Sequence, residues 1–165
     1  ITHEECVRLM LQYQSEGYVK FKTSPTYDGD FTKEHEMYIT DIIHCSGPVF
    51  VTHYPKAVKA FYMPVVDPSA EIQRVECFDL LFPDIGEVAG GSIRIHEYDE
   101  LLSRMTESNM NTDSLQWYID LRKYGTIPHS GAGLGIARLL MTITGIMNIK
   151  DMQDFPRSYG SVCIA

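Results

Sequence analysis

Four β-rich, apolar runs lie close together in the middle of the sequence, and patterns typical of helices precede and follow them. The runs cover residues 48–55, 57–63, 73–82 and 86–96 and are separated by turn-forming or polar residues. Strands grouped before helices favour an antiparallel sheet flanked by helices over alternating parallel βαβ units. This grouping therefore predicts an α+β fold.

The helices are expected before and after these strands in the sequence. Asp30 is a candidate N-cap for the second helix, in which Tyr38, Ile42 and Ile43 are expected to face the core. The acidic run "KEHE" at its start is predicted to be a solvated helix face. The helices predicted from apolar spacing cover residues 4–16, 31–43, 97–108, 112–125 and 134–144.

The size and charge of the chain limit its class. Its 165 residues, 44% of them hydrophobic, predict one domain. The chain does not begin with Met, so residues 1–165 are expected to be a single partial domain of a longer protein. No run of about 20 apolar residues predicts a membrane span, and the N-terminus does not resemble a secretory signal. With a net charge of −8 and no Lys/Arg cluster, most contacts with any nucleic acid are expected to lie elsewhere.

The cysteines do not have metal-ligand spacing. Cys6, Cys45, Cys77 and Cys163 lie far apart and never form a CxxC motif, which argues against a zinc or thioredoxin-type site. Cys77 lies among apolar residues and is expected to be buried. The pattern fits a reducing compartment, and we expect a cytoplasmic protein.

A glycine-rich segment leads into the last helix. In "PHSGAGLGIARLLM", residues 128–141, glycine alternates at Gly131, Gly133 and Gly135, and Arg138 follows. Alternating glycines strip one face of an extended segment, so that a flat ring can lie against the backbone. The planar, permanently charged guanidinium of Arg138 is suited to a phosphate or a base. The alternative is a glycine-rich entry to a helix that carries a surface arginine.

Two carboxylates are expected to converge on neighbouring strands. Asp79 and Glu87 flank a short turn, so they are predicted to face each other, with Mg²⁺ and triphosphate oxygens between them. Arg94 is seven residues beyond Glu87, an odd offset that places the two on opposite faces of a regular strand. A bulge at 90–91 would bring them together. The alternative is two ordinary strand-end acids and a solvated arginine.

Histidines give a weaker signal. His129, in the glycine-rich segment, is a candidate for the same cleft, although a loop histidine is more often exposed. No Ser/His/Asp or Cys/His arrangement is apparent, which disfavours covalent catalysis.

Several motifs together carry a resemblance to a known family. The segment "GAGLGIARLLM" resembles motif 3 of the class II aminoacyl-tRNA synthetases. The stretches "FTKEHEMYI", "PVFVTHYPKAVKAFYM", "FDLLFPDIGEVAGGSIRIHEYDELL" and "WYIDLRKYGTIPHSGAGLG" are similar to the asparaginyl branch. The resemblance covers roughly residues 20–157, and the motifs occur in the family's order.

The resemblance implies a nucleotide site. Arg138 matches the catalytic motif 3 arginine, which stacks on adenine and contacts the terminal phosphate of ATP. Asp79 and Glu87 match the acidic pair that holds ATP-bound Mg²⁺. Glu87, Gly133, Gly135 and Arg138 are thereby the implied ATP-binding residues, with the glycines clearing space for ATP and the aminoacyl-adenylate.

The resemblance also implies an amino-acid site and partners. Arg94 matches the arginine that reads the side chain of the amino acid, and His129 matches a histidine lining that pocket. The implied reaction is ATP-dependent activation of asparagine to its adenylate, followed by transfer to tRNA. The implied full-length protein is a homodimer without a membrane partner, and it contacts tRNA mainly through regions N-terminal to this segment.

The sequence departs from the family in two ways. Ala137 stands where members usually have an acid before the motif 3 arginine, and motif 1, motif 2 and the anticodon-binding domain have no counterpart. The expected fold is thus the C-terminal portion of a class II catalytic domain, inactive alone. Alternatives are an aspartyl-tRNA synthetase, a synthetase-like asparagine synthetase, or a non-catalytic relative that binds a nucleotide or a partner. A mitochondrial origin is also compatible with the sequence.

Overall fold

The protein is built around one four-stranded antiparallel sheet, as the sequence predicts. The computed structural model describes residues 1–157 and 159–160, so Cys163 lies outside the described residues. Neighbouring strands pair in the order β1-β2-β3-β4. The strands are β1 (Val49–Thr52), β2 (Cys77–Phe82), β3 (Gly86–Arg94) and β4 (His129–Leu134).

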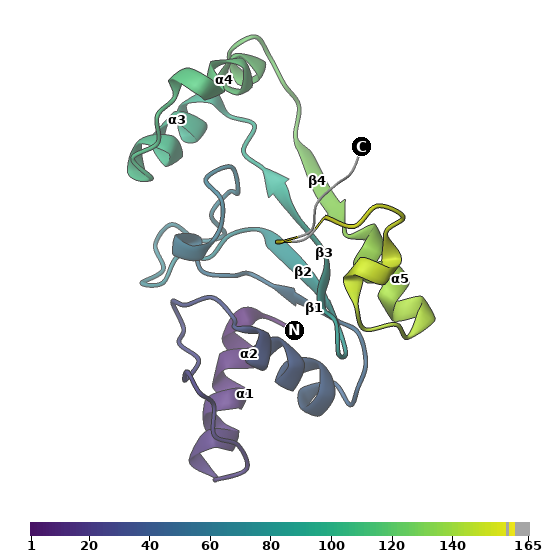
Figure 1. Cartoon of the computed structure of the whole chain (residues 1–165). Coiled ribbons are helices and arrows are strands. Elements are labelled where there is room, and N and C mark those ends of the chain that lie inside the picture. The colour runs from purple at the N-terminus through teal and green to yellow at the C-terminus, as the bar shows by residue number, and fades with distance from the viewer. Residues whose placement is uncertain (158, 161–165) are drawn as a thin grey trace.

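The helices lie in three groups around the sheet rather than in a single layer (Figure 1). α1 and α2 pack together near β1, α3 and α4 lie beyond the far end of β3, and α5 lies beside β4. The α-helices are α1 (His3–Ser15), α2 (Lys33–Tyr38), α3 (Tyr98–Glu107), α4 (Gln116–Lys123) and α5 (Ile136–Thr144). The described part of the chain contains no helix that is long and apolar enough to cross a membrane.

One predicted strand is wrong and one strand was missed. Residues 57–63 form no strand, because the chain turns at Lys56–Val58 in a short 3-10 helix and Phe61 packs with the residues of α3 and α4. Phe61 therefore anchors this loop to α3 and α4, whereas Met63 packs against the cluster that joins α1 to β1 and β2. Conversely, the glycine-rich segment, which was not among the predicted strands, forms β4 in its first part.

The second helix differs from its prediction at both ends. Thr32, not Asp30, is the N-cap of α2, because its side chain accepts the backbone N–H of His35. After Tyr38 the helix widens into a π-helical turn over Ile39–Ile43. This turn changes the helical phase, so Ile39 is buried and Ile42 is 55% exposed.

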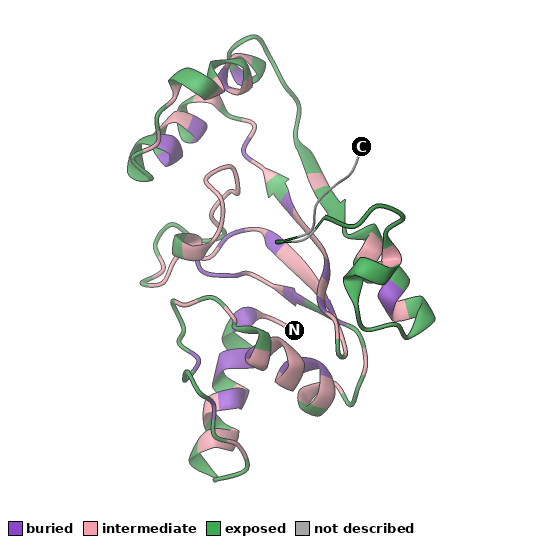
Figure 2. Ribbon diagram, viewed as in Figure 1, coloured by how far each residue is buried: buried purple, intermediate pink, exposed green. Residues whose placement is uncertain are grey.

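Two hydrophobic clusters stabilise the two ends of the molecule. The first joins α1 to β1 and β2, with Met10, Val51 and Leu81 fully buried, and it includes Cys77 as expected. The second joins α3 and α4 through residues such as Leu101 and Ile119. Figure 2 shows that β4 and the described residues after it remain largely exposed, whereas most residues of β2 and β3 are buried or intermediate.

Candidate functional site

A row of residues across the sheet forms the floor of a cavity. In the strand register Asp79 is opposite Gly90, and Gly90 is opposite Gly133. Because the two glycines have no side chain, the sheet face beside Asp79 is open. The cavity above it has a volume of about 840 Å³. Its lining includes the predicted residues Asp79, Glu87, Arg94, Gly133, Gly135 and Arg138.

A β-bulge brings Glu87 and Arg94 to the same cavity. The register between β2 and β3 shifts at Leu80/Leu81, which leaves Val88 as an extra residue of β3. The extra residue reverses the alternation of side chains between Glu87 and Arg94. The predicted bulge therefore exists, but not at 90–91, because both glycines there keep their partners on β2 and β4.

The carboxylates of Asp79 and Glu87 converge over Gly90, although the two residues are not register partners. Glu87 pairs with Leu81 instead. A Cβ placed on Gly90 would lie 3.1 Å from Asp79 Oδ1 and 2.8 Å from Glu87 Oε1. Both oxygens thus occupy the space that the missing side chain leaves free.

A third acid, Glu36 of α2, faces this pair, which corrects the prediction of a solvated helix face. Its Oε2 would lie 2.6 Å from a Cβ on Gly86 at the start of β3. Burial, and then the charges of Glu87 and Asp79, raise the pKa of the Glu36 carboxyl. His35 beside it is also buried, and its Nε2 lies 2.8 Å from the carbonyl oxygen of Thr23.

Arg138 is held near the start of β3 by Glu87. Its Nη1 donates a 2.6 Å hydrogen bond to the carbonyl oxygen of Glu87 and lies 4.0 Å from the Glu87 carboxylate. Its side chain stays 48% exposed. The Glu87 contacts therefore orient the guanidinium, while part of it remains accessible to a ligand.

Arg94, at the other end of β3, lies between an aromatic ring and the backbone. Its guanidinium carbon lies 4.3 Å from the centroid of the Tyr62 ring. Its Nη2 donates a 3.2 Å hydrogen bond to the carbonyl oxygen of Gly131. A Cβ on Gly131 would lie 2.9 Å from that nitrogen, so the absence of a side chain at Gly131 makes room for Arg94 itself.

Lys59 forms an ion pair inside the cavity. Its Nζ lies 2.6 Å from Asp79 Oδ2, and each side chain is only 15% exposed. Burial lowers the pKa of Lys59, but its hydrogen bond to Asp79 and the nearby negative charges, chiefly that of Asp79, together raise the pKa above its ordinary value, so that the ammonium stays charged. Burial and the charge of Asp79 also raise the pKa of Tyr54, whose ring lies 3.9 Å from Lys59 Nζ.

His129 is the predicted site residue that the structure does not bring into the cavity. It is opposite Arg94 in the register, but it is exposed and absent from the cavity lining. Its Nδ1 lies 2.8 Å from the carbonyl oxygen of Ile127, which fixes the ring locally. A role in binding the amino acid stays a prediction.

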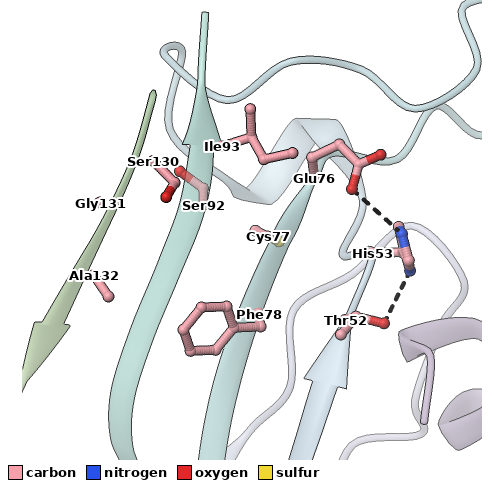
Figure 3. Close-up of a pocket in the computed structure, with 10 residues that line it drawn as sticks. All are labelled: Thr52, His53, Glu76, Cys77, Phe78, Ser92, Ile93, Ser130, Gly131 and Ala132. Carbon is pink, nitrogen blue, oxygen red and sulfur yellow. Dashed lines mark hydrogen bonds and ion pairs between the residues drawn. The ribbon is translucent and has the colours of Figure 1, made fainter. Parts of the chain in front are cut away.

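A smaller cavity of about 400 Å³ lies over the face that carries Phe78 (Figure 3). There Thr52 Oγ1 lies 2.9 Å from His53 Nδ1, and His53 Nε2 lies 3.6 Å from a Glu76 carboxylate oxygen. The second distance is beyond hydrogen-bond reach, so the three side chains do not form a connected relay for nucleophilic catalysis.

Lys59, Tyr62 and Glu36 were not predicted as site residues from the sequence. The available signal for Lys59 was a charged residue inside the apolar run of residues 57–63. Glu36 was hidden in a charged run whose neighbours suggested a solvated surface. Tyr62 had no distinguishing pattern, because its role depends on the turn that replaces the predicted strand.

Comparisons with known families match almost the whole chain. The family model described as tRNA synthetases class II (D, K and N) matches residues 1–159. The chain is 44% identical over 163 residues to the asparagine–tRNA ligase of Metamycoplasma arthritidis and 47% identical over 161 residues to that of Clostridium botulinum. These alignments cover 98% of this chain but 34% and 33% of the relatives. The chain thus spans about a third of the length of these relatives.

Solved structures agree with the sequence comparison. The Entamoeba histolytica asparaginyl-tRNA synthetase in complex with asparaginyl-adenylate matches with a TM-score of 0.81 and 35% identity, over 96% of this chain and 34% of that one. The Pyrococcus horikoshii asparaginyl-tRNA synthetase complexed with asparaginyl-adenylate matches with a TM-score of 0.81 and 34% identity. This match covers 98% of this chain and 35% of that one. An aspartyl enzyme from Entamoeba histolytica, at 24% identity, shares the fold. The chain belongs to the class II tRNA synthetases of the group formed by the aspartate, lysine and asparagine enzymes.

Proposed function

We propose that this chain is part of an asparagine–tRNA ligase and forms one wall of the site where ATP and asparagine react to give asparaginyl-adenylate. The observation that carries the proposal is a single cavity with an arginine near each end of β3. Arg138 lies beside Glu87 and Arg94 lies at the last residue of the strand. This separation suits an elongated ligand with a nucleotide at one end and a small amino acid at the other.

The nucleotide end lies over the glycines that precede Arg138. Nothing in the described residues lies within 4 Å of a Cβ placed on Gly133, so the backbone there is open to a ligand. The accessible guanidinium of Arg138 offers a planar, permanently charged surface for a base and a phosphate. Arg138 thus binds and orients ATP, and its charge offsets that of the phosphates.

Arg94 serves the amino-acid end. Its planar guanidinium is fixed by the ring of Tyr62 and the carbonyl of Gly131, so it enters the reaction already oriented. A fixed donor of this kind suits the side-chain carbonyl of asparagine. Attack of the asparagine carboxylate on the α-phosphate releases pyrophosphate, and transfer of the asparaginyl group to tRNA follows.

Asp79 and Glu87 have the donor chemistry for Mg²⁺ carried by ATP. Among the residues that the structure describes, no group of three or more His, Cys, Asp or Glu side chains is arranged to hold a metal ion. Two converging carboxylates match an ion that is bound mainly through substrate phosphates rather than a cage made by the protein. When bound, Mg²⁺ would offset the charge of the phosphates.

Binding of non-hydrolysable sulfamoyl analogues of the adenylates to the full-length protein tests the proposal. Isothermal titration calorimetry should show tight binding of the asparaginyl analogue and much weaker binding of the aspartyl one. Arg94→Ala should weaken binding of the asparaginyl analogue and leave binding of ATP close to wild type. Arg138→Ala should weaken binding of the asparaginyl analogue and of ATP. Equal affinity for the two analogues would favour an aspartyl or non-selective enzyme, and binding of neither would refute an activation site.

A further inference from the structure

The two oxygens of the Asp79 carboxylate have different neighbours. Oδ2 accepts a 2.6 Å hydrogen bond from Lys59 Nζ. Oδ1 is directed toward the open position over Gly90, which it shares with Glu87 Oε1. Lys59 thus occupies one oxygen and leaves the other facing the second carboxylate.

The orientation of Lys59 is itself fixed. Its chain leaves the short turn Lys56–Val58, and its ammonium is enclosed by Asp79 and the ring of Tyr54. A buried ion pair is costly unless its geometry is good, and removal of one partner leaves the other charge uncompensated. The Lys59–Asp79 contact therefore restricts both side chains, because neither has a solvated alternative at 15% exposure.

Lys59 also limits repulsion within the site. Asp79 and Glu87 bring two negative charges to the space over Gly90, and Glu36 adds a third nearby. Without a cation, carboxylates this close would turn away from each other. The ammonium on the outer side of Asp79 holds it in place against this repulsion.

We propose that Lys59 is a positioning residue of the activation site, which fixes Asp79 through Oδ2 so that Oδ1 and the Glu87 carboxylate together meet the cation-bound phosphates of the nucleotide. This inference rests on the proposed function, since it assigns Lys59 a task within the same site. In this proposal Lys59 acts on the nucleotide through Asp79 rather than by direct contact. Loss of such an orienting partner typically lowers metal affinity or activity by about 10- to 100-fold.

The chain offers a matched control in Lys56, three residues earlier. Its Nζ pairs with Glu107 at 2.7 Å, and it does not line the cavity. Lys56→Met and Lys59→Met each remove one ammonium from the same turn and keep most of the side-chain volume. Only Lys59→Met releases Asp79.

The test measures binding of Mg²⁺ with a non-hydrolysable ATP analogue, by calorimetry, and the KM values of the full-length protein. Lys59→Met should weaken analogue binding and raise the KM for ATP by about tenfold or more, with the KM for asparagine within about twofold of wild type. Lys59→Arg, which restores a donor to Asp79, should recover most of the loss. Lys56→Met should behave as wild type.

A double-mutant cycle with Asp79→Asn separates positioning from a general loss of structure. Asp79→Asn alone leaves the buried Lys59 ammonium unpaired. Adding Lys59→Met to Asp79→Asn removes that charge, so it should cause no further loss of analogue binding. A further tenfold loss there, equal losses from Lys56→Met and Lys59→Met, or wild-type binding by Lys59→Met would overturn the inference. A wild-type protein without asparagine-dependent activity would instead refute the proposed function, which keeps the two failures distinct.

Discussion

The guanidinium of Arg94 lies directly against the backbone of Gly131, with its Nη2 donating a 3.2 Å hydrogen bond to the Gly131 carbonyl oxygen. A methyl group on Gly131 would meet this nitrogen at 2.9 Å. Gly131 is thus required for the position of an arginine on the neighbouring strand. Gly133, two residues further, has no such neighbour within 4 Å.

The two glycines should therefore respond differently to alanine. In the full-length protein, Gly131→Ala should displace Arg94 and raise the KM for asparagine on the order of 10- to 100-fold, because small misplacements of a substrate-positioning group are costly. Gly133→Ala should leave the KM for asparagine near wild type and raise the KM for ATP, because its methyl group enters the nucleotide end of the cavity. Steady-state kinetics with each substrate varied in turn measures the two KM values. The reverse pattern would contradict the assignment of the nucleotide and amino-acid ends of the cavity.

The fold was largely predictable because its strands are marked by apolar, β-branched residues. β1, β2 and β3 lie inside predicted runs, and the antiparallel arrangement follows from their grouping. β4 was missed because its glycines give no alternation of apolar and polar residues. Its pairing with β3, which the sequence pattern does not indicate, makes this segment a strand. The run 57–63 was mistaken for a strand because Phe61 and Met63, which anchor a loop to the two hydrophobic clusters, give the same apolar pattern as a strand.

The site was predictable where a motif marks it and not where tertiary contacts create it. Asp79, Glu87, Arg94 and Arg138 were identified in advance and all line one cavity. Their neighbours Lys59 and Glu36 were not predicted. Lys59 and Asp79 are 20 residues apart in the sequence, and Glu36 contacts β3 from a separate helix. His129 was assigned to the pocket from its motif, yet its ring contacts the carbonyl oxygen of Ile127, two residues before it in the chain.

Acid should destabilise the protein through His3. Burial, and then the charge of Arg74, lower the pKa of His3 to about 4. The folded state keeps this ring neutral, while the unfolded chain takes up a proton below about pH 6.5, so stability is lost as pH falls from about 6.5 toward 4. The full difference corresponds to on the order of 3 kcal/mol. Urea unfolding at pH 7 and pH 5 should show the larger part of this loss, and His3→Gln should flatten the pH dependence. An unchanged slope in that variant would count against this account.

Glu36 should affect stability with the opposite sign. Its raised pKa means that the folded state binds its proton more tightly than the unfolded chain, so its contribution falls as pH rises above the ordinary carboxyl range. Glu36→Gln should therefore raise the melting temperature at pH 7, and the gain should disappear near pH 4. Glu34→Gln is the control, because Glu34 accepts a 3.0 Å hydrogen bond from the backbone of Lys22, and it should bring no gain. A lower melting temperature for Glu36→Gln at pH 7 would contradict the proximity of the three acids.

Ala137→Glu should stabilise α5 without pairing with Arg138. Ala137 is the second residue of the helix, whose first turn contains no acid and whose N-cap forms no side-chain hydrogen bond. A carboxylate there interacts favourably with the helix dipole by about 0.3–1 kcal/mol, whereas adjacent helical residues do not face each other. Thermal unfolding should show a slightly higher melting temperature, with the affinity for ATP in the full-length protein equal or better. A large loss of stability together with no shift on adding Mg²⁺ and ATP would argue against a nucleotide site.

Asparagine-dependent exchange of pyrophosphate into ATP tests the central claim most directly, because it reports adenylate formation without tRNA. The full-length protein should catalyse exchange with asparagine and far less with aspartate, and Arg138→Ala should lower the rate by on the order of 100-fold or more. The 165-residue chain alone, which forms one wall of the site, should show no exchange. Exchange by the isolated chain at the full-length rate, or aspartate serving as well as asparagine, would contradict the account.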